Sequence, residues 1–393
     1  MAPGPSGAPD PVWLARFVRP GFADAQPYDA SHHDFAWRNR ELSRLMSNEC
    51  PLPPPPTVVA AAVEALGQAN LYPNSGWELR DALAAFTGVS SDRVILGNGS
   101  TEILDVATRA FVGPGDEAVI SVPTYAFFET QVRLYGGRPV LVPMTPDLRF
   151  DTEAIVAAVT PDTKLIFLCS PNNPTGNSWT IPEIETVLGA GIPTVVDQAY
   201  LECGYSTSFA ALVPRHENLI VTRTMSKAFG LAALRIGYGV ADPAVVELLL
   251  RIRIPFSVSL VAIRAGLAAV RDPAVLDERR GFISSERERV FAGLVDLPGV
   301  RPWQSDGNFI TIDISETGRA SADVVDAARS EGLLLRRVSA HRLTGQYVRV
   351  TIGTVAQNDR FLDVFARALG DPGEAVALGV AGGAGGGSGG TPA

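Results

Sequence analysis

The sequence predicts an α/β protein with a mostly parallel sheet covered by helices on both faces, followed by a smaller α+β domain. One observation is the regular alternation of short strands with helical stretches between residues 94 and 240. Another is that these strands are apolar along their length, as residues 118–122 and 164–168 show, which is typical of strands buried on both faces. After residue 255 the alternation weakens, and this change predicts a second domain.

The predicted large domain begins with helices at residues 57–66 and 79–86, after a proline-rich run at 51–56 that can only be extended. Strand 94–96 then leads through Gly97-Asn-Gly-Ser-Thr101 into a helix. Glycines and hydroxyls at such a junction favour anion binding, because the first helical amides lack internal partners. In a parallel sheet the functional loops follow the carboxyl ends of the strands. The other predicted strands of this domain are 118–122, 138–142, 164–168, 194–196, 219–222 and 236–240.

We divide the chain into five parts. Residues 1–12 are rich in Pro, Gly and Ala and are expected to be disordered, and residues 371–393 form a flexible glycine-rich tail. We expect residues 13–56 to form an N-terminal arm that joins the small domain, residues 57–255 to form the large, ligand-binding domain, and residues 256–370 to form the small C-terminal domain. The small domain is expected to have helices at 259–270, 273–295, 321–332 and 359–369, with strands at 308–313 and 348–352.

Composition and charge exclude several classes of protein. The net charge of −9 and the lack of a basic cluster argue against nucleic acid as a partner. No uncharged apolar run reaches the roughly 18 residues of a membrane span. The first residues lack the basic and apolar segments of a signal peptide, so we expect a soluble cytoplasmic protein. The three cysteines, Cys50, Cys169 and Cys203, share no metal-ligand spacing, and we expect no metal site.

Residues 221–239 place a single lysine, Lys227, between hydroxyl side chains and an arginine. Lysine amines form Schiff bases with carbonyl substrates and with pyridoxal phosphate, so a lysine among apolar strands indicates covalent or catalytic use. Thr224, Ser226 and Arg235 would then supply hydroxyl groups and a guanidinium to a phosphate. The alternative is a surface lysine that pairs with a carboxylate, and this stretch by itself leaves that alternative open.

Other strand ends carry groups that suit a pyridine cofactor. Asp197 follows strand 194–196, and a carboxylate that faces a ring nitrogen keeps that nitrogen protonated. The alternative role of Asp197 is a helix cap. The loop Ser170-Pro-Asn-Asn-Pro-Thr-Gly176 follows another strand, and its Asn173 amide could reach a ring hydroxyl, although the loop also fits a plain turn. Pro123-Thr-Tyr125 offers an aromatic face for ring stacking.

Together these motifs resemble those of fold-type I pyridoxal-phosphate aminotransferases of class I/II. Within that family the chain is most similar to the histidinol-phosphate aminotransferase group, whose arm also carries a Pro-Tyr and a Ser-Asn-Glu, here Pro27-Tyr28 and Ser47-Asn-Glu49. The resemblance implies a transaminase of amino-acid biosynthesis with pyridoxal 5'-phosphate as its cofactor. It covers residues 20–370 and rests on six motifs in order: Gly97-Asn-Gly-Ser, Pro123-Thr-Tyr, Ser170-Pro-Asn-Asn-Pro-Thr-Gly, Asp197-Gln-Ala-Tyr, Ser226-Lys-Ala-Phe-Gly and Arg349-Val-Thr-Ile-Gly.

The resemblance also implies a role for individual residues around the cofactor. Lys227 would bind the cofactor covalently, and Asp197 would pair with the ring nitrogen. Asn173 and Tyr200 would hold the ring hydroxyl, while Tyr125 would stack on the ring. Tyr72 matches a tyrosine that the family contributes from the neighbouring subunit, so the resemblance implies a homodimer. The residues that would hold the cofactor phosphate are Ser100, Thr101, Thr224, Ser226 and Arg235, together with Tyr72.

On the substrate side, Arg349 matches the arginine that binds a substrate carboxylate through two nitrogens. Tyr28 and Arg360 occupy positions that lie near the distal or anionic end of the substrate in histidinol-phosphate enzymes, and Asn173 is expected near the substrate as well. The expected reaction moves an amino group from a small amino-acid or amino-phosphate donor to a 2-oxo acid such as 2-oxoglutarate. The freed amine of Lys227 would remove and return the α-proton.

Departures from the family pattern concern the substrate pocket. An apolar surface near Phe127 and Phe128 could favour an aromatic or apolar amino acid, so an aminotransferase for aromatic or specialised-metabolite amino acids stays open. A pyridoxal-phosphate-dependent amino-acid decarboxylase also stays open, because the fold does not decide the reaction. The departures are Gln198 in place of a more frequent Glu, Cys50 in place of Asn, Thr101 in place of Asp, and Ala-Phe-Phe at 126–128 in place of a more polar Gly-x-Tyr.

Overall fold

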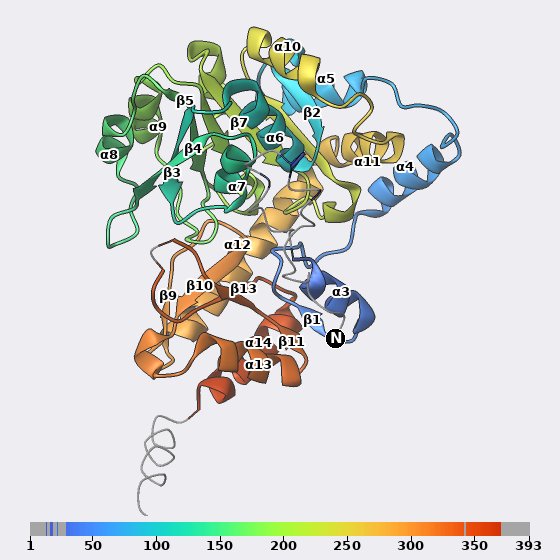
Figure 1. The fold of residues 1–393 in the computed structure, drawn as a ribbon. Coiled ribbons are helices and arrows are strands. Elements are labelled where there is room, and N and C mark those ends of the chain that lie inside the picture. Colours follow the sequence, from blue (N-terminus) through green and yellow to red (C-terminus); the bar gives the residue numbers. More distant parts are fainter. Residues whose placement is uncertain (1–12, 14–15, 19–21, 23–28, 342, 371–393) are drawn as a thin grey trace, which may run out of the picture.

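The larger sheet has seven strands and confirms the predicted α/β fold. The computed structural model describes residues 13, 16–18, 22, 29–341 and 343–370 (Figure 1). Adjacent strands of the large sheet are parallel except in the two pairs that include β8. In spatial order the strands are β2 (Val94–Asn98), β8 (Ile236–Val240), β7 (Leu219–Thr224), β6 (Thr194–Asp197), β5 (Thr163–Cys169), β3 (Glu117–Val122) and β4 (Arg138–Pro143).

Helices cover both faces of this sheet, and each face has its own apolar core. Along β7, Ile220 lies in one core and Val221 in the other, which is the period-two pattern of a strand buried on both faces. The face with Val221 packs against helices α4 (Pro56–Leu66), α5 (Trp77–Thr87), α8 (Thr152–Ala157), α9 (Ile181–Leu188) and α11 (Leu260–Val270). The face with Ile220 packs against α6 (Gly99–Phe111), α7 (Phe127–Leu134) and α10 (Pro243–Ile252).

The second sheet is antiparallel and builds the smaller α+β unit. A capping box between Thr354 and Gln357 sets the start of α14, the last helix. Figure 1 shows α12 running from the large sheet to this second sheet. The core there includes Ile310, Val350 and Phe361. The strands, in spatial order, are β12 (Arg336–Val338), β13 (Tyr347–Thr351), β10 (Phe309–Asp313) and β9 (Arg301–Pro302), and the helices are α12 (Pro273–Val295), α13 (Ser321–Ser330) and α14 (Val355–Leu369).

The described part of the N-terminal arm lies beside the small unit. Helix α3 (Ser31–Arg38) precedes β1 (Ser43–Arg44), which pairs in parallel with β11 (Leu333–Leu334). Leu45 is then buried in the core of the small unit. Three residues later, Asn48 reaches the large domain by donating to Tyr200. The arm therefore connects the small unit with the edge of the large sheet.

Helix α11 lies on the large-domain side of the predicted division. It packs against α4, α5 and β8, and its Ile263 belongs to the core of the large sheet. Farther along, α12 contributes Ile283 to the large core and Val290 to the small one. The domain boundary at residue 255 stays a prediction, and this packing favours a boundary farther along the chain, within α12. None of the helices in the described ranges is both long enough and apolar enough to cross a membrane.

Candidate active site

The candidate active site lies where β6 and β7 end. Asp197 is the last residue of β6, and its partner across the two strands is Thr222 of β7. The turn after β7 carries Ser226 and Lys227 before the chain returns as the antiparallel strand β8. The strand register therefore brings the predicted carboxylate and the predicted lysine to one edge of the sheet, where ligands bind in folds of this kind.

Asp197 is a buried carboxyl group. Its side chain is 3% exposed, and its Oδ1 accepts a hydrogen bond from the Thr222 hydroxyl at 2.8 Å. Burial raises the pKa of Asp197 to about 6, although hydrogen bonds from Thr222 and the Ala199 backbone and the charge of Lys227 act in the opposite direction. A cationic N–H facing this carboxylate would offset the cost of burying its charge.

Lys227 is one of two lysines in the chain, and its amine lies among the other site residues. Its Nζ donates to the carbonyl oxygen of Ser47 at 3.4 Å and lies 5.2 Å from the centroid of the Tyr200 ring. Burial lowers the pKa of Lys227 to about 8, and the charge of Arg349 acts in the same direction. A larger fraction of this amine is therefore neutral near pH 8 than for an ordinary lysine, as a nucleophile or base requires.

Hydroxyl and guanidinium groups gather beside the start of α6. Ser226 Oγ accepts hydrogen bonds from the Thr224 hydroxyl at 2.9 Å and from Arg235 Nη1 at 3.1 Å. The backbone N–H of Gly99 donates to the carbonyl oxygen of Arg235 at 2.9 Å. Ser100 and Thr101 follow in the first turn of α6, so this arrangement combines a helix N-terminus with a cation and several hydroxyls, which suits a phosphate.

Two glycines permit this close approach. Gly99 has φ +72°, and a Cβ there would collide with the guanidinium of Arg235. A Cβ at Gly237 of β8 would collide with the backbone of Gly99 and Ser100. Only glycine leaves room for the helix start to lie directly over β8 and beside Arg235.

Tyr200 is a buried phenol whose hydroxyl group is positioned by the arm. The ring is 6% exposed and packs edge-to-face on Phe309 with centroids 5.2 Å apart. Asn48 Nδ2 donates to the phenol oxygen at 3.0 Å. Burial raises the pKa of Tyr200 well above its ordinary value, so the phenol stays neutral and can donate its proton in a hydrogen bond. Tyr125, after β3, is partly buried and its ring stacks on that of Phe127.

Arg349 of β13 reaches the large domain through Asn173. Its Nη1 donates to Asn173 Oδ1 at 2.6 Å, and its Nη2 donates to the carbonyl oxygen of Met46 at 3.1 Å. The guanidinium carbon lies 5.4 Å from the centroid of the Phe309 ring. The amide oxygen of Asn173 is therefore occupied by Arg349, and its amide nitrogen is the group that could face a ring hydroxyl.

Three of the predicted residues lie apart from this cluster or outside the described part of the chain. Tyr72 is 83% exposed, and its ring stacks on Phe256 of the same chain with centroids 5.0 Å apart. Arg360 is exposed on α14 and donates to the carbonyl oxygen of Glu331 at the end of α13. The helical periodicity explains this, because the next residue, Phe361, is buried in the small core. Tyr28 lies outside the described residues.

The expected apolar surface at Phe127 and Phe128 is only half present. Helix α7 begins at Phe127, so the two side chains point in different directions. Phe128 is fully buried and stacks on Phe167 of β5, with ring centroids 4.7 Å apart. Phe128 is therefore a core residue, and Phe127 alone lies beside Tyr125.

Sequence reasoning assigned no role to two polar side chains that contact site residues directly. Asn48 holds the phenol oxygen of Tyr200, and Thr222 holds the carboxylate of Asp197. Asn48 belongs to the Ser-Asn-Glu motif that we noted without assigning it a role. Thr222 lies two residues before Thr224, so the strand period places both hydroxyls on one face of β7, which was a usable signal.

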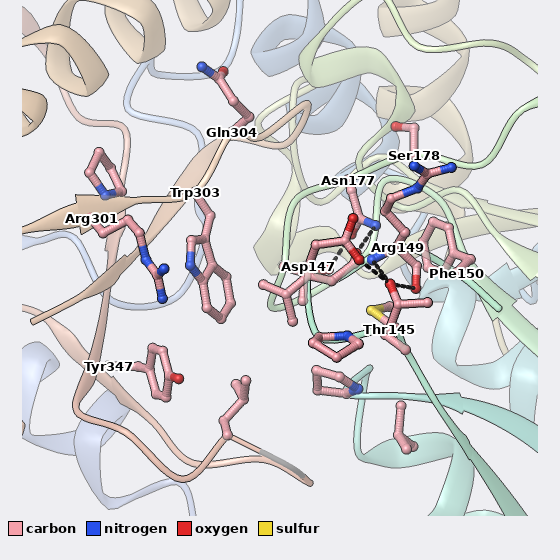
Figure 2. Close-up of a pocket in the computed structure, with 18 of the residues that line it drawn as sticks. Thr145, Asp147, Arg149, Phe150, Asn177, Ser178, Arg301, Trp303, Gln304 and Tyr347 are labelled. Carbon is pink, nitrogen blue, oxygen red and sulfur yellow. Dashed lines mark hydrogen bonds between the residues drawn. The ribbon is translucent and has the colours of Figure 1, made fainter. Parts of the chain in front are cut away.

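A cavity of about 860 Å³ lies between the two sheets. Figure 2 shows Arg301, Trp303 and Tyr347 on one wall, facing Asp147 and Arg149 on the other. Tyr347 lies two residues before Arg349, so both side chains leave the same face of β13. The cavity therefore lies on the face of β13 that carries Arg349, although Arg349 itself does not line it.

The donor set at the strand ends fits pyridoxal 5'-phosphate. A buried carboxyl group, Asp197, suits the ring nitrogen, and the neutral phenol of Tyr200 with the amide nitrogen of Asn173 suits the ring hydroxyl. The hydroxyls around Arg235 suit the phosphate. The amine of Lys227 suits the aldehyde, with which lysines form Schiff bases.

Comparisons with known proteins find similar chains of known family. The model of the aminotransferase class I and II family matches residues 40–365. The histidinol-phosphate aminotransferase of Methanothermobacter thermautotrophicus is 36% identical over 335 residues, which are 84% of this chain and 90% of that protein. The enzyme of the same name from Anaeromyxobacter sp. is 35% identical over 357 residues, covering 89% and 96% of the two chains. The crystal structure of histidinol-phosphate aminotransferase from Sinorhizobium meliloti in complex with pyridoxal-5'-phosphate is similar with a TM-score of 0.82 and 27% identity, covering 90% and 97% of the two chains.

Proposed function

Because the chain belongs to the class I and II aminotransferases, which depend on pyridoxal phosphate, we propose that it transfers an amino group between histidinol phosphate and a 2-oxo acid such as 2-oxoglutarate. The observation that carries the proposal is the identity of about 36% with enzymes of that name over most of both chains. The Arg349 guanidinium, which donates to Asn173 and Met46 and whose charge reaches Lys227, supports an acidic substrate.

A second cationic surface supports a substrate that carries a phosphate. Arg336 of β12 lies directly across from Arg349 on β13, so the two side chains leave the same face of the sheet. Arg336 is exposed. Burial is the main cause that lowers the pKa of His32 to about 4, and the charge of Arg336 is the second cause. The arm therefore lies within electrostatic reach of Arg336. Guanidinium groups on one face can bind a carboxylate and a phosphate in turn, as the two substrates of a transaminase require.

Each residue of the site has a separate role in the proposed reaction. When bound, pyridoxal phosphate supplies an electron sink for the carbon that loses its proton. The amine of Lys227 removes that proton and returns it, and its lowered pKa makes it a base near neutral pH. Asp197 keeps the ring nitrogen protonated, while Tyr200 and Asn173 hold the ring hydroxyl. Arg349 orients the 2-oxo acid, and the amino acid formed from it, by the carboxylate.

The test is a half-reaction screen with the purified holoenzyme. We mix it in turn with histidinol phosphate, histidinol, glutamate and phenylalanine, and record the absorbance of the aldehyde and amine forms of the cofactor. We expect conversion to the amine form by histidinol phosphate and glutamate, and weaker conversion by histidinol, which lacks the phosphate. The matched variant Arg336→Met should raise the KM for histidinol phosphate about tenfold and leave that for histidinol unchanged.

Other results would indicate a different substrate or a different reaction. Conversion by phenylalanine but not by histidinol phosphate would indicate an aromatic aminotransferase. Release of carbon dioxide without lasting conversion of the cofactor would indicate a decarboxylase. Either result would contradict the proposed substrate while leaving the cofactor assignment intact.

The proposal includes a homodimer in which Tyr72 serves the neighbouring subunit. Support comes from exposed apolar side chains beside this residue: Leu71 precedes it, Phe256 stacks on it, and both are more than half exposed. Val63 and Leu66 of α4 are more than half exposed as well. Surfaces of this kind on a soluble chain mark association sites. Tyr72 lies at such a surface rather than beside Ser226 and Arg235 of its own chain.

Mixing two inactive variants tests this arrangement. If Tyr72 acts in the neighbouring subunit, a hybrid of a Lys227→Ala chain and a Tyr72→Ala chain has one intact site. After exchange of subunits at limiting cofactor, activity should recover to about a quarter of the wild-type value, because half of the dimers are hybrids with one intact site in two. If activity stays at the sum of the two separate variants, Tyr72 does not act across the subunits.

A further inference from the structure

A buried ion pair lies on the opposite face of the sheet from Asp197. Arg223 of β7 and Glu202 are each 3% exposed, and Gln198 is fully buried. Arg223 Nη1 lies 3.6 Å from Glu202 Oε1, and its Nη2 donates to Gln198 Oε1 at 3.3 Å. Charged groups are rarely buried without a purpose, because removing them from water costs more than a surface pair does.

The contacts of Arg223 enclose a short segment of the site. Asp197 and Tyr200 are separated by two residues, and Gln198 and Glu202 lie at either end of the stretch that includes Tyr200. One guanidinium thus contacts both ends of the turn that follows Asp197. The turn is closed by its own backbone, because Leu201 N–H donates to the carbonyl oxygen of Gln198 at 3.2 Å.

Three further hydrogen bonds fix Gln198 in place, so its contact with Arg223 also fixes the position of the turn. Its Nε2 donates to the carbonyl oxygen of Thr207 at 2.8 Å, and its Oε1 also accepts from the N–H of Phe209 at 3.0 Å. Its backbone N–H donates to the carbonyl oxygen of Thr222 at 2.8 Å. Gln198 therefore links the turn to β7 at the residue that binds Asp197.

The alternation of β-strands explains how a cluster on one face acts on the other. Asp197 and Thr222 meet on one face of the sheet, while the following residues, Gln198 and Arg223, meet on the other face. Any shift of Gln198 relative to Arg223 would shift Asp197 relative to Thr222, because the same two backbones carry both pairs. The contact between Gln198 and Arg223 therefore fixes the direction of the Asp197 carboxylate on the opposite face.

We propose that Arg223 and Glu202 are positioning residues, which act through Gln198 to aim Asp197 and Tyr200 at the cofactor. The inference rests on the proposed roles of Asp197 and Tyr200 as cofactor contacts. It goes beyond them because neither Arg223 nor Glu202 faces the cofactor side of the sheet. A role in folding alone would predict a loss of stability without any change in how the apo-protein binds the cofactor.

The chain offers a matched control at the other end of the same sheet. Glu117 is 2% exposed at the start of β3, and its carboxylate pairs with Arg138 and accepts a hydrogen bond from Thr160. Glu117→Gln removes the charge of a buried carboxylate at the amino ends of the strands, away from the site. Glu202→Gln likewise removes the charge of a buried carboxylate, but it does so next to Arg223 and the turn that follows Asp197.

The experiment compares apo-proteins of Glu202→Gln, Arg223→Met, Glu117→Gln and Asp197→Asn. Affinity for pyridoxal phosphate is measured by quenching of tryptophan fluorescence, and thermal stability is measured in parallel. We expect Glu202→Gln and Arg223→Met to weaken cofactor binding about tenfold and to shift the absorbance of the bound cofactor, since displaced supporting groups have effects of this size. Glu117→Gln should lower the melting temperature but bind the cofactor as the wild type does.

The possible results distinguish the positioning role of Arg223 and Glu202 from the cofactor role of Asp197. If Glu202→Gln and Arg223→Met are merely less stable and bind the cofactor with wild-type affinity and absorbance, the positioning role is wrong. If Asp197→Asn also binds as the wild type does, the cofactor role of Asp197 is wrong as well. Should Arg223→Met fail to fold, Glu202→Gln keeps the test valid, because it changes one oxygen for a nitrogen and retains the shape of the side chain.

Discussion

The proposed cofactor side and the proposed substrate side of the site are built in different ways. On the cofactor side, Asp197, Thr224 and Lys227 come from adjacent strands of one sheet and the turn that follows. On the substrate side, Arg349 comes from the small sheet and reaches Asn173 of the large domain. Strand pairing therefore sets the cofactor side, whereas the substrate side depends on how the two sheets are placed relative to each other.

The two sides also differ in their electrostatics. Burial raises the pKa of Asp197 and lowers that of Lys227, which moves both groups toward neutrality. Arg349 donates hydrogen bonds to an amide oxygen and a backbone carbonyl oxygen, and an arginine side chain stays protonated in proteins. Titratable groups with shifted pKa values are a mark of functional sites. Burial thus sets the protonation of the groups on the cofactor side, whereas the substrate side relies on a permanent charge.

The largest effect is expected at Lys227. Lys227→Ala should lower turnover at least about 10³-fold, because it removes the base and the covalent attachment of the cofactor. Noncovalent cofactor binding should persist, since the carboxylate and phosphate contacts remain. The measurement is steady-state turnover together with borohydride reduction, which should fix the cofactor to one lysine peptide in the wild type only. Lys164→Ala is the control, because that lysine donates to Pro161 near the amino end of β5 and should leave activity intact.

Asp197→Asn should have the next largest effect, lowering turnover about 10³-fold with a wild-type fold. It should also change the pH dependence of the apo-protein. Between pH 3.8 and about 6 the folded chain holds a proton on Asp197 that the unfolded chain has released. The free energy of unfolding of the wild type therefore falls as pH rises through this window, by up to about 3 kcal/mol.

Melting temperatures of both apo-proteins at pH 4 and pH 7 check this sign. The variant should gain stability relative to the wild type as pH rises, because it carries no buried charge. If the difference between the two proteins is the same at both pH values, burial does not tune Asp197, and the contrast between the two sides loses its basis.

Arg349→Met should affect the substrate side alone. We expect kcat/KM for a carboxylate substrate to fall about 10²-fold, because a bidentate charge-assisted contact is lost. The absorbance and affinity of the bound cofactor should stay at wild-type values, which equilibrium titration measures. A comparable loss of cofactor affinity would show that the two sides are coupled through Asn173.

The smallest effect is expected at Arg360. Its guanidinium contacts the end of α13 rather than the site, so Arg360→Ala should change kcat/KM for histidinol phosphate less than about twofold. The same assay on Arg336→Met supplies the comparison, since that residue lies across from Arg349. A large loss at Arg360 with none at Arg336 would restore the substrate role that the sequence indicated.

Much of the cofactor side could be predicted from the sequence because its signals are local. A strand that ends in Asp197, a Ser-Lys turn after β7 and glycines before α6 each follow from a few neighbouring residues. Parallel pairing then brings strand ends to one edge, so motifs far apart in the chain needed no further information to meet. Thr222 could have been included on the same grounds, by its spacing from Thr224.

Tertiary structure decided the rest, because the remaining contacts join surfaces that no local pattern relates. Helix packing turned Phe128 into the core and Arg360 away from the site, although a place in the substrate pocket was expected for both. The crossing of the arm placed Asn48 on Tyr200 over a separation of 152 residues. By itself the sequence determined the strands, the turns and the chemistry at their ends. The docking of the two sheets, which depends on the shapes of buried side chains, brought Arg349 of the small unit within electrostatic reach of Lys227.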